Sequence, residues 1–360
     1  RDVYKRQLEG MSENNSAVET SSHAEPVKVS VRNHTGVIEL DRPRALNSLN
    51  PEMLDIIRQA LSQWREDENV QQVLVHSRSP KAFCAGGDVR AARDGVLEER
   101  WGQVDEFFEK EYKLNGDIAE YPKPYISVID GVVMGGGLGI SAHGSHRIVT
   151  DKAFASMPEM AIGYITDVGV AYMAQRMIGT RGKSDPALAK FWGLSGYRMY
   201  AADMLWAGLA THVIESPQAF IDDVIAVGVD AAAEKHAIKP EGKPELAELI
   251  DDIDEVFAFD TWADIKQALP AHPQLAEVFA KLTEKASPSS LVAATELFAG
   301  EAKAKDVREA LRMELALGKH MLRRPDFVEG VRAVLVDKTH DAAFPAAGEA
   351  AEFREVIANA

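Results

Sequence analysis

The chain has 360 residues, which is long enough for one large domain or two with a substantial core, and its formal net charge is −16 at pH 7. This acidic balance argues against a nucleic-acid partner, because phosphate binding needs a basic face, and no apolar run approaches the roughly 18 residues of a membrane-spanning helix. Cys84 is the only cysteine, so no intramolecular disulfide can form, which suits a reducing compartment and leads us to expect a cytoplasmic protein.

The N-terminal segment is expected to lie outside the folded part. Residues 1–25 are polar and lack the apolar stretch of a secretory signal, so we predict a disordered leader. Residues 1–10 resemble a translated leader, and Met11 is the native start that we expect. We therefore place a catalytic core at residues 26–215 and a helical C-terminal region at residues 216–360.

The core opens with strand patterns and one clear helix. Apolar and polar residues alternate over residues 27–31 and 35–41 with a turn between them, which predicts a β-hairpin. Asn50-Pro51-Glu52 supplies a cap, a proline and an acid, and predicts the start of an amphipathic helix. Residues 72–76 form the next predicted strand, and a loop containing Gly86 and Gly87 follows it.

Two further helices are expected, from Val89 onward and over about residues 98–120, and the second contains Glu111. Strands joined by helices of this length imply a parallel sheet, whose active end lies at the carboxyl ends of the strands. The fold class is therefore α/β.

The centre of the chain combines a strand pattern with a run of glycines. Residues 125–129 form an apolar strand pattern, and Gly135, Gly136 and Gly137 come before an apolar run. This predicts a glycine-rich loop at the start of a buried helix, where free N–H groups can face an anion or oxyanion. A run of glycines most often marks only a tight turn, so the loop alone does not establish a site.

Two acids follow this loop. Residues 147–150 are predicted to form a strand, Glu159 lies beyond it, and Asp167 comes eight residues later. Any two acids are more often solvated loop residues than catalytic groups. Their position after two glycine loops is what makes them candidates.

The rest of the chain is mainly helical. Helices are expected over residues 168–178, 187–192 and 203–207, and a short strand over 212–214. Beyond residue 216 we predict amphipathic helices at about 218–234, 245–257, 262–269, 274–286, 290–304, 307–321 and 327–335. They share no fixed repeat, so the region should cover one end of the core or form a contact in a homo-oligomer.

The order of four motifs gives a specific resemblance to the crotonase superfamily of acyl-CoA enzymes. The motifs are Leu46-Asn47-Ser48-Leu49, Ala82-Phe83-Cys84-Ala85-Gly86-Gly87-Asp88, Asp130-Gly131-Val132-Val133-Met134-Gly135-Gly136-Gly137 and Met157-Pro158-Glu159. The resemblance implies a crotonase-like spiral of repeated ββα units with a helical C-terminal region. It also implies that the two glycine loops form an oxyanion hole from main-chain N–H groups.

Within this superfamily the chain is most similar to the family of 3-hydroxyisobutyryl-CoA hydrolases. Enoyl-CoA hydratases have a glutamate two residues after the glycine triplet, where this chain has Gly139. The hydrolases have an aspartate eight residues after the Met-Pro-Glu glutamate, where Asp167 stands. The segments 286–291 and 326–338 also resemble the helical tail of the hydrolases.

The resemblance implies hydrolysis of a short 3-hydroxyacyl-CoA thioester in valine breakdown. It gives catalytic roles to Glu159, Asp167 and the N–H groups of Gly87 and Gly136, and substrate-binding roles to Glu111, Gly136, Glu159 and Asp167. No metal is implied, and coenzyme A enters only as part of the substrate. Thr166 and Val170 depart from the family pattern around the aspartate, which leaves the exact acyl group open.

Two other functions are compatible with the motifs. An enoyl-CoA hydratase or isomerase could work with one glutamate, and an acyl-CoA-binding protein could keep the fold without catalysis. Cys84 is expected to be a small buried residue and not a nucleophile, and His143 and His146 are expected to have local structural roles.

Overall fold

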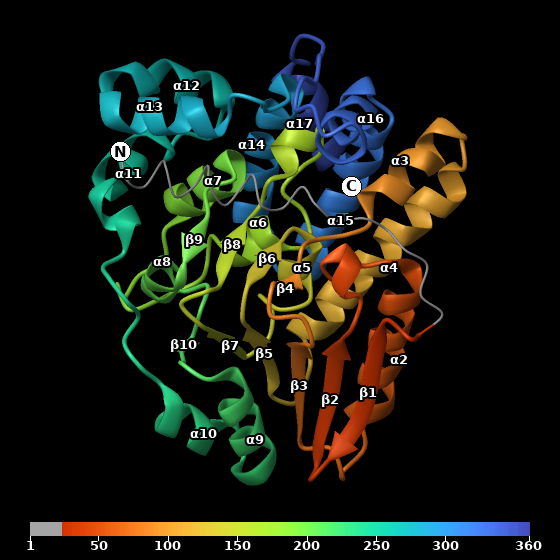
Figure 1. The fold of residues 1–360 in the computed structure, drawn as a ribbon. Helices are drawn as coiled ribbons and strands as arrows, with labels where there is room; N and C mark the ends of the chain where they lie inside the picture. The colour runs from red at the N-terminus through yellow and green to blue at the C-terminus, as the bar shows by residue number, and fades with distance from the viewer. Residues whose placement is uncertain (1–23) are drawn as a thin grey trace.

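The structure is a computed structural model that describes residues 24–360 (Figure 1). The predicted leader, except for its last two residues, and the expected start at Met11 lie outside the described residues. Among residues 24–360, no helix combines the length and the apolar character needed to cross a bilayer.

Two sheets form the core. The larger sheet has the strand order β1 (Val27–Arg32), β2 (Thr35–Leu40), β3 (Gln72–Ser77), β5 (Tyr125–Ile129), β7 (His146–Val149) and β10 (His212–Val213). The smaller sheet has the order β4 (Ala82–Cys84), β6 (Val132–Met134), β8 (Phe154–Ser156) and β9 (Met199–Tyr200). Pairing is antiparallel between β1 and β2 and between β8 and β9, and parallel elsewhere.

Local sequence signals explain the first elements. Asn33 and His34 have φ values of 43° and 62°, so they form the tight turn of the predicted hairpin between β1 and β2. The Oδ1 of Asn50 accepts a hydrogen bond from Met53 N at 2.9 Å and caps helix α2 (Pro51–Arg65), as predicted.

The two sheets alternate along the chain. β3, β5 and β7 of the larger sheet are followed by β4, β6 and β8 of the smaller sheet, and then by helical segments. This repeat confirms the crotonase-like α/β class. Besides η1 (Pro43–Ala45) and α2, the helical segments of the core are α3 (Val89–Leu97), α4 (Trp101–Ala119), α5 (Gly136–Gly139), η2 (Glu159–Ile162), α6 (Val170–Met173), α7 (Pro186–Ser195) and α8 (Ala201–Ala207).

The smaller sheet positions the candidate site. β4, β6 and β8 are neighbouring parallel strands, so their carboxyl ends meet at one edge. Gly87 follows β4, Gly136 follows β6 and Glu159 follows β8. Sequence reasoning placed Glu159 beyond the strand at residues 147–150, but the strand that carries it is β8.

Helices form the C-terminal region, as predicted. They are α9 (Pro217–Val227), α10 (Val229–His236), η3 (Glu245–Glu248), α11 (Ile250–Val256), α12 (Trp262–Ala268), η4 (Leu269–Ala271), α13 (Pro273–Leu282), α14 (Pro288–Ala302), α15 (Val307–Leu322), α16 (Pro325–Val331), the π-helical turn η5 (Arg332–Val336) and α17 (Ala350–Ala358). In Figure 1 the helices from α14 onward gather at the end of the core where α5 and α6 lie. α15 packs on α4, and α16 packs on α3 and η2.

The structure corrects several helix predictions. The single helix expected at 245–257 is the 3-10 turn η3 followed by α11. The single helix expected at 218–234 is divided at Gly228, which has φ 91°. The helix expected at 168–178 is reduced to α6 (Val170–Met173). It begins only at Val170 because Val168 and Gly169 have φ values of 54° and 75°, and turns follow Met173. α17 was not predicted. The division at residues 215/216 remains a prediction, and the largest hydrophobic cluster contains residues from both sides of it.

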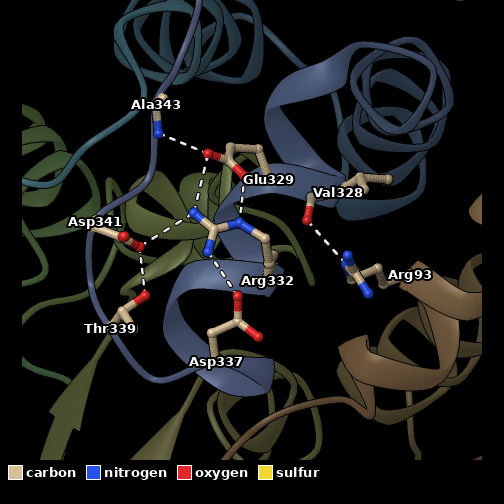
Figure 2. Close-up of polar contacts among 8 residues, drawn as sticks. All are labelled: Arg93, Val328, Glu329, Arg332, Asp337, Thr339, Asp341 and Ala343. Atoms are coloured by element: carbon tan, nitrogen blue, oxygen red, sulfur yellow. Dashed lines mark hydrogen bonds and ion pairs between the residues drawn. The ribbon is translucent and has the colours of Figure 1, made fainter.

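Arg332 holds the segment after α16 in place (Figure 2). Its guanidinium donates to Glu329 at 2.6 Å, to Asp337 at 2.7 Å and to Asp341 at 3.1 Å. On the other side of α16, Arg93 of α3 donates to the Val328 carbonyl at 3.0 Å. Several linked charges stabilise more than an isolated surface pair, so the network holds the segment around Asp337 and Asp341 against the end of α16, whereas the Arg93 bond joins α16 to α3.

Candidate active site

Two glycine loops bring their main-chain N–H groups close together. A Cβ built on Gly136 would lie 3.1 Å from the Gly87 nitrogen, so the two loops are in van der Waals contact. Gly86 and Gly135 have φ values of 134° and 50°, which L side chains rarely adopt. In the described part of the chain, neither Gly87 N–H nor Gly136 N–H donates a hydrogen bond. Both are therefore available for a ligand oxygen.

The first loop is held by the segment around Asn47. Asn47 Nδ2 donates to the Phe83 carbonyl at 2.9 Å, next to the start of the loop. Leu49 N donates to the Gly86 carbonyl, and Asp88 N donates to the Leu49 carbonyl, each at 2.8 Å. These bonds explain in physical terms why the first two motifs of the resemblance occur together.

Two glutamates face the second loop. Glu111 of α4 has its Oε2 2.8 Å from the position of a Cβ on Gly136, and Glu159 at the start of η2 has its Oε2 3.1 Å from the position of a Cβ on Gly135. The exposed fractions of Glu111 and Glu159 are 2% and 7%. Glu111 Oε2 and Glu159 Oε1 have no hydrogen-bond partner among the described residues.

Asp167 completes the cluster through tyrosine contacts. Tyr112 donates its hydroxyl hydrogen to Asp167 Oδ2 at 2.7 Å, and the hydroxyl oxygens of Tyr112 and Tyr164 are 2.7 Å apart. Since the Tyr112 proton is directed at Asp167, Tyr164 donates to Tyr112. This chain of hydroxyls orients one oxygen of Asp167.

The carboxyl groups cannot all be ionised at neutral pH. Burial, followed by repulsion from Asp167, raises the pKa values of both Glu111 and Glu159 well above their usual range. Burial also raises the pKa of Asp167 to about 7, although the Tyr112 hydrogen bond opposes this change. A cluster that holds protons near neutrality is suited to proton transfer.

A second buried carboxyl pair lies behind Asp167. Glu314 of α15 is fully buried, and its Oε1 accepts a hydrogen bond from Gly169 N at 2.9 Å. Burial and the neighbouring Glu314 raise the pKa of the fully buried Glu301, on α14, well above its usual range. Sequence reasoning missed both residues, because each lies on an ordinary helix pattern and the contact depends on tertiary packing.

Replacement of Glu314 by glutamine is expected to make stability less dependent on pH. Burial raises the Glu314 pKa from 4.5 to about 8, so the folded state keeps a proton that the unfolded state has released. The free energy of unfolding should therefore fall as pH rises through this window, by at most about 1.4 kcal/mol per pH unit for this group. Glutamine retains an oxygen that can accept from Gly169 but cannot ionise.

Urea unfolding of the wild-type and Glu314→Gln proteins at several values between pH 5 and pH 9 measures this effect. The variant should gain stability relative to wild type as pH rises. Glu355→Gln, at an exposed glutamate of α17, is the matched control. Parallel pH profiles for wild type and Glu314→Gln would show that the Glu314 carboxyl titrates normally.

The space beside Gly139 is filled. A Cβ on Gly139 would lie 2.6 Å from Asn115 Nδ2 and 2.8 Å from Val168 Cβ. A glutamate side chain cannot extend from this position without displacing both residues. The structure thus supports the distinction from hydratases that was based on Gly139.

Cys84 and the two histidines contribute no free reactive group. Burial raises the pKa of Cys84 to about 12, and its thiol donates to the Asn47 carbonyl at 3.1 Å, so it remains a thiol. His143 Nε2 lies 2.7 Å from the Val168 carbonyl, and His146 Nδ1 lies 2.7 Å from Ser145 Oγ. The expectation of a small buried cysteine is confirmed.

Comparison with known proteins agrees with this geometry. The enoyl-CoA hydratase/isomerase family matches residues 35–358. The 3-hydroxyisobutyryl-CoA hydrolase of Xenopus laevis, named as mitochondrial, is 37% identical over 322 residues, which are 85% of this chain and 81% of the relative. A carnitinyl-CoA dehydratase structure from Mycobacterium thermoresistibile has a TM-score of 0.81 and 35% identity, covering 93% of this chain and 96% of that one.

An enoyl-CoA hydratase structure from Rhodobacter sphaeroides 2.4.1 has a TM-score of 0.78 and 33% identity, covering 92% of this chain and 96% of that one. These similarities extend over both the sheets and the C-terminal helices. The chain therefore belongs to the enoyl-CoA hydratase/isomerase family, the crotonase superfamily, and groups there with the 3-hydroxyisobutyryl-CoA hydrolases.

Proposed function

We propose that the protein hydrolyses the thioester of 3-hydroxyisobutyryl-CoA, or of a closely related short 3-hydroxyacyl-CoA, to the free hydroxy acid and CoA. The observation that carries this proposal is the position of Glu159. Its carboxyl group lies against Gly135, next to the two free N–H groups of Gly87 and Gly136. A carbonyl group held by the two N–H groups would present its carbon to this carboxylate.

The reaction follows from these positions. The thioester oxygen accepts hydrogen bonds from Gly87 N–H and Gly136 N–H, and each donor lowers the barrier to the tetrahedral intermediate by about 3 kcal/mol. Glu159 either attacks the carbonyl carbon, which gives an anhydride that water then opens, or removes a proton from the attacking water. In both routes the C–S bond breaks and water supplies the new carboxyl oxygen.

Asp167 is assigned the transfer of a proton, and Glu111 a contact with the substrate. CoA leaves as a thiolate that must gain a proton, and Asp167, whose pKa is about 7, can donate one near neutrality. Glu111 Oε2 lies 2.8 Å from the position of a Cβ on Gly136, and we assign it a contact with the bound acyl group. These groups suffice for the reaction, so we propose that no metal or further cofactor takes part.

We also propose a role in valine catabolism, in the cytoplasm, as a homo-oligomer. The substrate named for the Xenopus laevis relative supports the pathway. The single buried cysteine is compatible with a reducing compartment. The relative is named as mitochondrial, so fractionation of the source cells, followed by immunodetection, is the direct test of location.

A panel of CoA esters tests the proposed reaction. Thiol release should be fastest with 3-hydroxyisobutyryl-CoA and slower with esters that lack the hydroxyl group. A tenfold preference corresponds to about 1.4 kcal/mol of discrimination in the transition state. Release of no thiol from any short ester, together with tight ester binding, would instead support a non-catalytic acyl-CoA-binding protein.

Enoyl-CoA hydratase activity is the second candidate, because the similar Rhodobacter sphaeroides structure is named an enoyl-CoA hydratase and the Mycobacterium thermoresistibile structure a carnitinyl-CoA dehydratase. Gly139 opposes it, because the space beside this residue is occupied by Asn115 and Val168. We expect incubation with crotonyl-CoA to leave the absorbance of the conjugated thioester unchanged while 3-hydroxyisobutyryl-CoA is hydrolysed. Rapid loss of that absorbance would establish hydration and overturn this assignment.

A further inference from the structure

Asn115 has a fully buried amide with no hydrogen-bond partner. Its exposed fraction is 0%, and neither Oδ1 nor Nδ2 makes a hydrogen bond to another described residue. Leaving a buried polar atom unpaired destabilises the folded state, so native proteins rarely retain one without a ligand or water. The mechanism above does not use this residue.

Asn115 lies in the same row of α4 as Glu111. The two residues are four positions apart, so their side chains leave the helix on one face. That face packs on α5, where Glu111 lies next to Gly136 and Asn115 lies next to Gly139. The Asn115 amide therefore lies one turn of α4 away from Glu111, which is next to the candidate oxyanion hole.

Asn115 also lies next to the Asp167 turn. The position of a Cβ on Gly139 is within 2.8 Å of both Asn115 Nδ2 and the Cβ of Val168, the residue after Asp167. The neighbourhood of Gly139 thus contains one unpaired amide and the turn that carries Asp167, whose Oδ2 already accepts from Tyr112. Unlike Asp167, the Asn115 amide is a neutral group, and both its donor Nδ2 and its acceptor Oδ1 are free.

The chemistry of an amide matches that of a hydroxyl group. A hydroxyl has one proton to donate and lone pairs to accept, and an asparagine offers an oxygen and an N–H group on one plane. We propose that Asn115 binds the hydroxyl group of the acyl chain and selects 3-hydroxyacyl over plain acyl thioesters. This inference rests on the proposed function and assigns its substrate specificity to one residue.

The test compares two substrates in one experiment. The value of kcat/KM is measured by thiol release for 3-hydroxyisobutyryl-CoA and for isobutyryl-CoA, with wild type and Asn115→Ala. Wild type should prefer the hydroxylated ester by at least about tenfold, because a site built to bond a hydroxyl strongly rejects its absence. Asn115→Ala should reduce this ratio to within about threefold of one, mainly by losing activity on the hydroxylated ester.

Two further variants make the result specific. Leu114→Ala removes a buried side chain from the adjacent position of α4, and it should slow both substrates alike without changing the ratio. Asn115→Leu is close to asparagine in size and replaces Asn115→Ala if the smaller residue prevents cooperative folding.

The outcomes separate the two proposals. If wild type prefers the hydroxylated ester and the Asn115 variants keep that preference, Asn115 holds a structural water or only packs, and this inference alone is overturned. If wild type hydrolyses neither ester, the proposed function fails and this inference fails with it. A ratio that collapses in the Asn115 variants but not in Leu114→Ala supports the assignment.

Discussion

Replacement of Glu159 by glutamine is expected to lower kcat for thioester hydrolysis by about 10³-fold or more. The carboxylate supplies either the nucleophile or the general base, and an amide of the same size can supply neither. KM should change little, because the remote parts of CoA provide most of the ground-state binding. The measurement is steady-state thiol release from 3-hydroxyisobutyryl-CoA.

The loss must be separated from misfolding. Glutamine fits the same space next to Gly135 as glutamate. Burial raises the pKa of Glu159, so an ionised carboxylate at this position destabilises the fold, and glutamine removes that cost. The thermal midpoint of Glu159→Gln at pH 8 should therefore equal or exceed that of wild type. The exposed Glu355→Gln variant controls for the general effect of losing one charge. Thiol release at the wild-type rate in Glu159→Gln would remove Glu159 from the reaction.

The elements with a strong local signal could be predicted from the sequence. The alternation and turn around Asn33 define the first hairpin, and Asn50 defines the start of α2, because these residues act on the backbone beside them. β4, β6 and β8 have only three residues each, so their alternation is too short to recognise. The helix start at residue 168 was predicted wrongly because Val168 is left-handed in a turn whose backbone contacts His143 and Glu314, which no local pattern encodes.

The candidate site could be predicted only in part, because some of its contacts join residues that are far apart in sequence. The glycine loops and Glu159 each follow a strand of the smaller sheet, so sequence order and parallel pairing bring them together. The support for Asp167 comes from Tyr112 and Glu314, which lie far away in sequence. Packing of α15 on α4 creates those contacts, and no local pattern encodes it.

The buried acids also explain why the C-terminal helices are present. Glu314 on α15 accepts a hydrogen bond from Gly169 N, two residues after Asp167. η2, which carries Glu159, packs against α16, and Ser287 N donates to the Met160 carbonyl at 2.8 Å. The helical region therefore supports the acids of the site, and its removal should disturb their positions before it disturbs the glycine loops.

Replacement of Gly136 by alanine is expected to lower kcat/KM by about 10²- to 10³-fold. The new methyl group would lie 3.1 Å from the Gly87 nitrogen and 2.8 Å from Glu111 Oε2, in the space where the thioester oxygen must accept two hydrogen bonds. Alanine keeps its own N–H group, but its methyl group blocks access to the Gly87 N–H, and an oxyanion that loses one donor typically loses about 10²- to 10³-fold in kcat. Glu111 can rotate away, but the Gly87 backbone cannot, so the block persists after relaxation.

Gly102→Ala provides the matched control, because a Cβ at Gly102 on α4 meets no atom within 4 Å. This variant should keep wild-type activity and gain slightly in stability, since alanine favours a helix more than glycine does. Calorimetric titration with CoA should give similar affinities for wild type and Gly136→Ala, because the methyl group lies at the reacting carbonyl and not at the phosphates. Full activity in Gly136→Ala would mean that the carbonyl is polarised by groups other than the two glycine loops, and the oxyanion hole would have to be placed elsewhere.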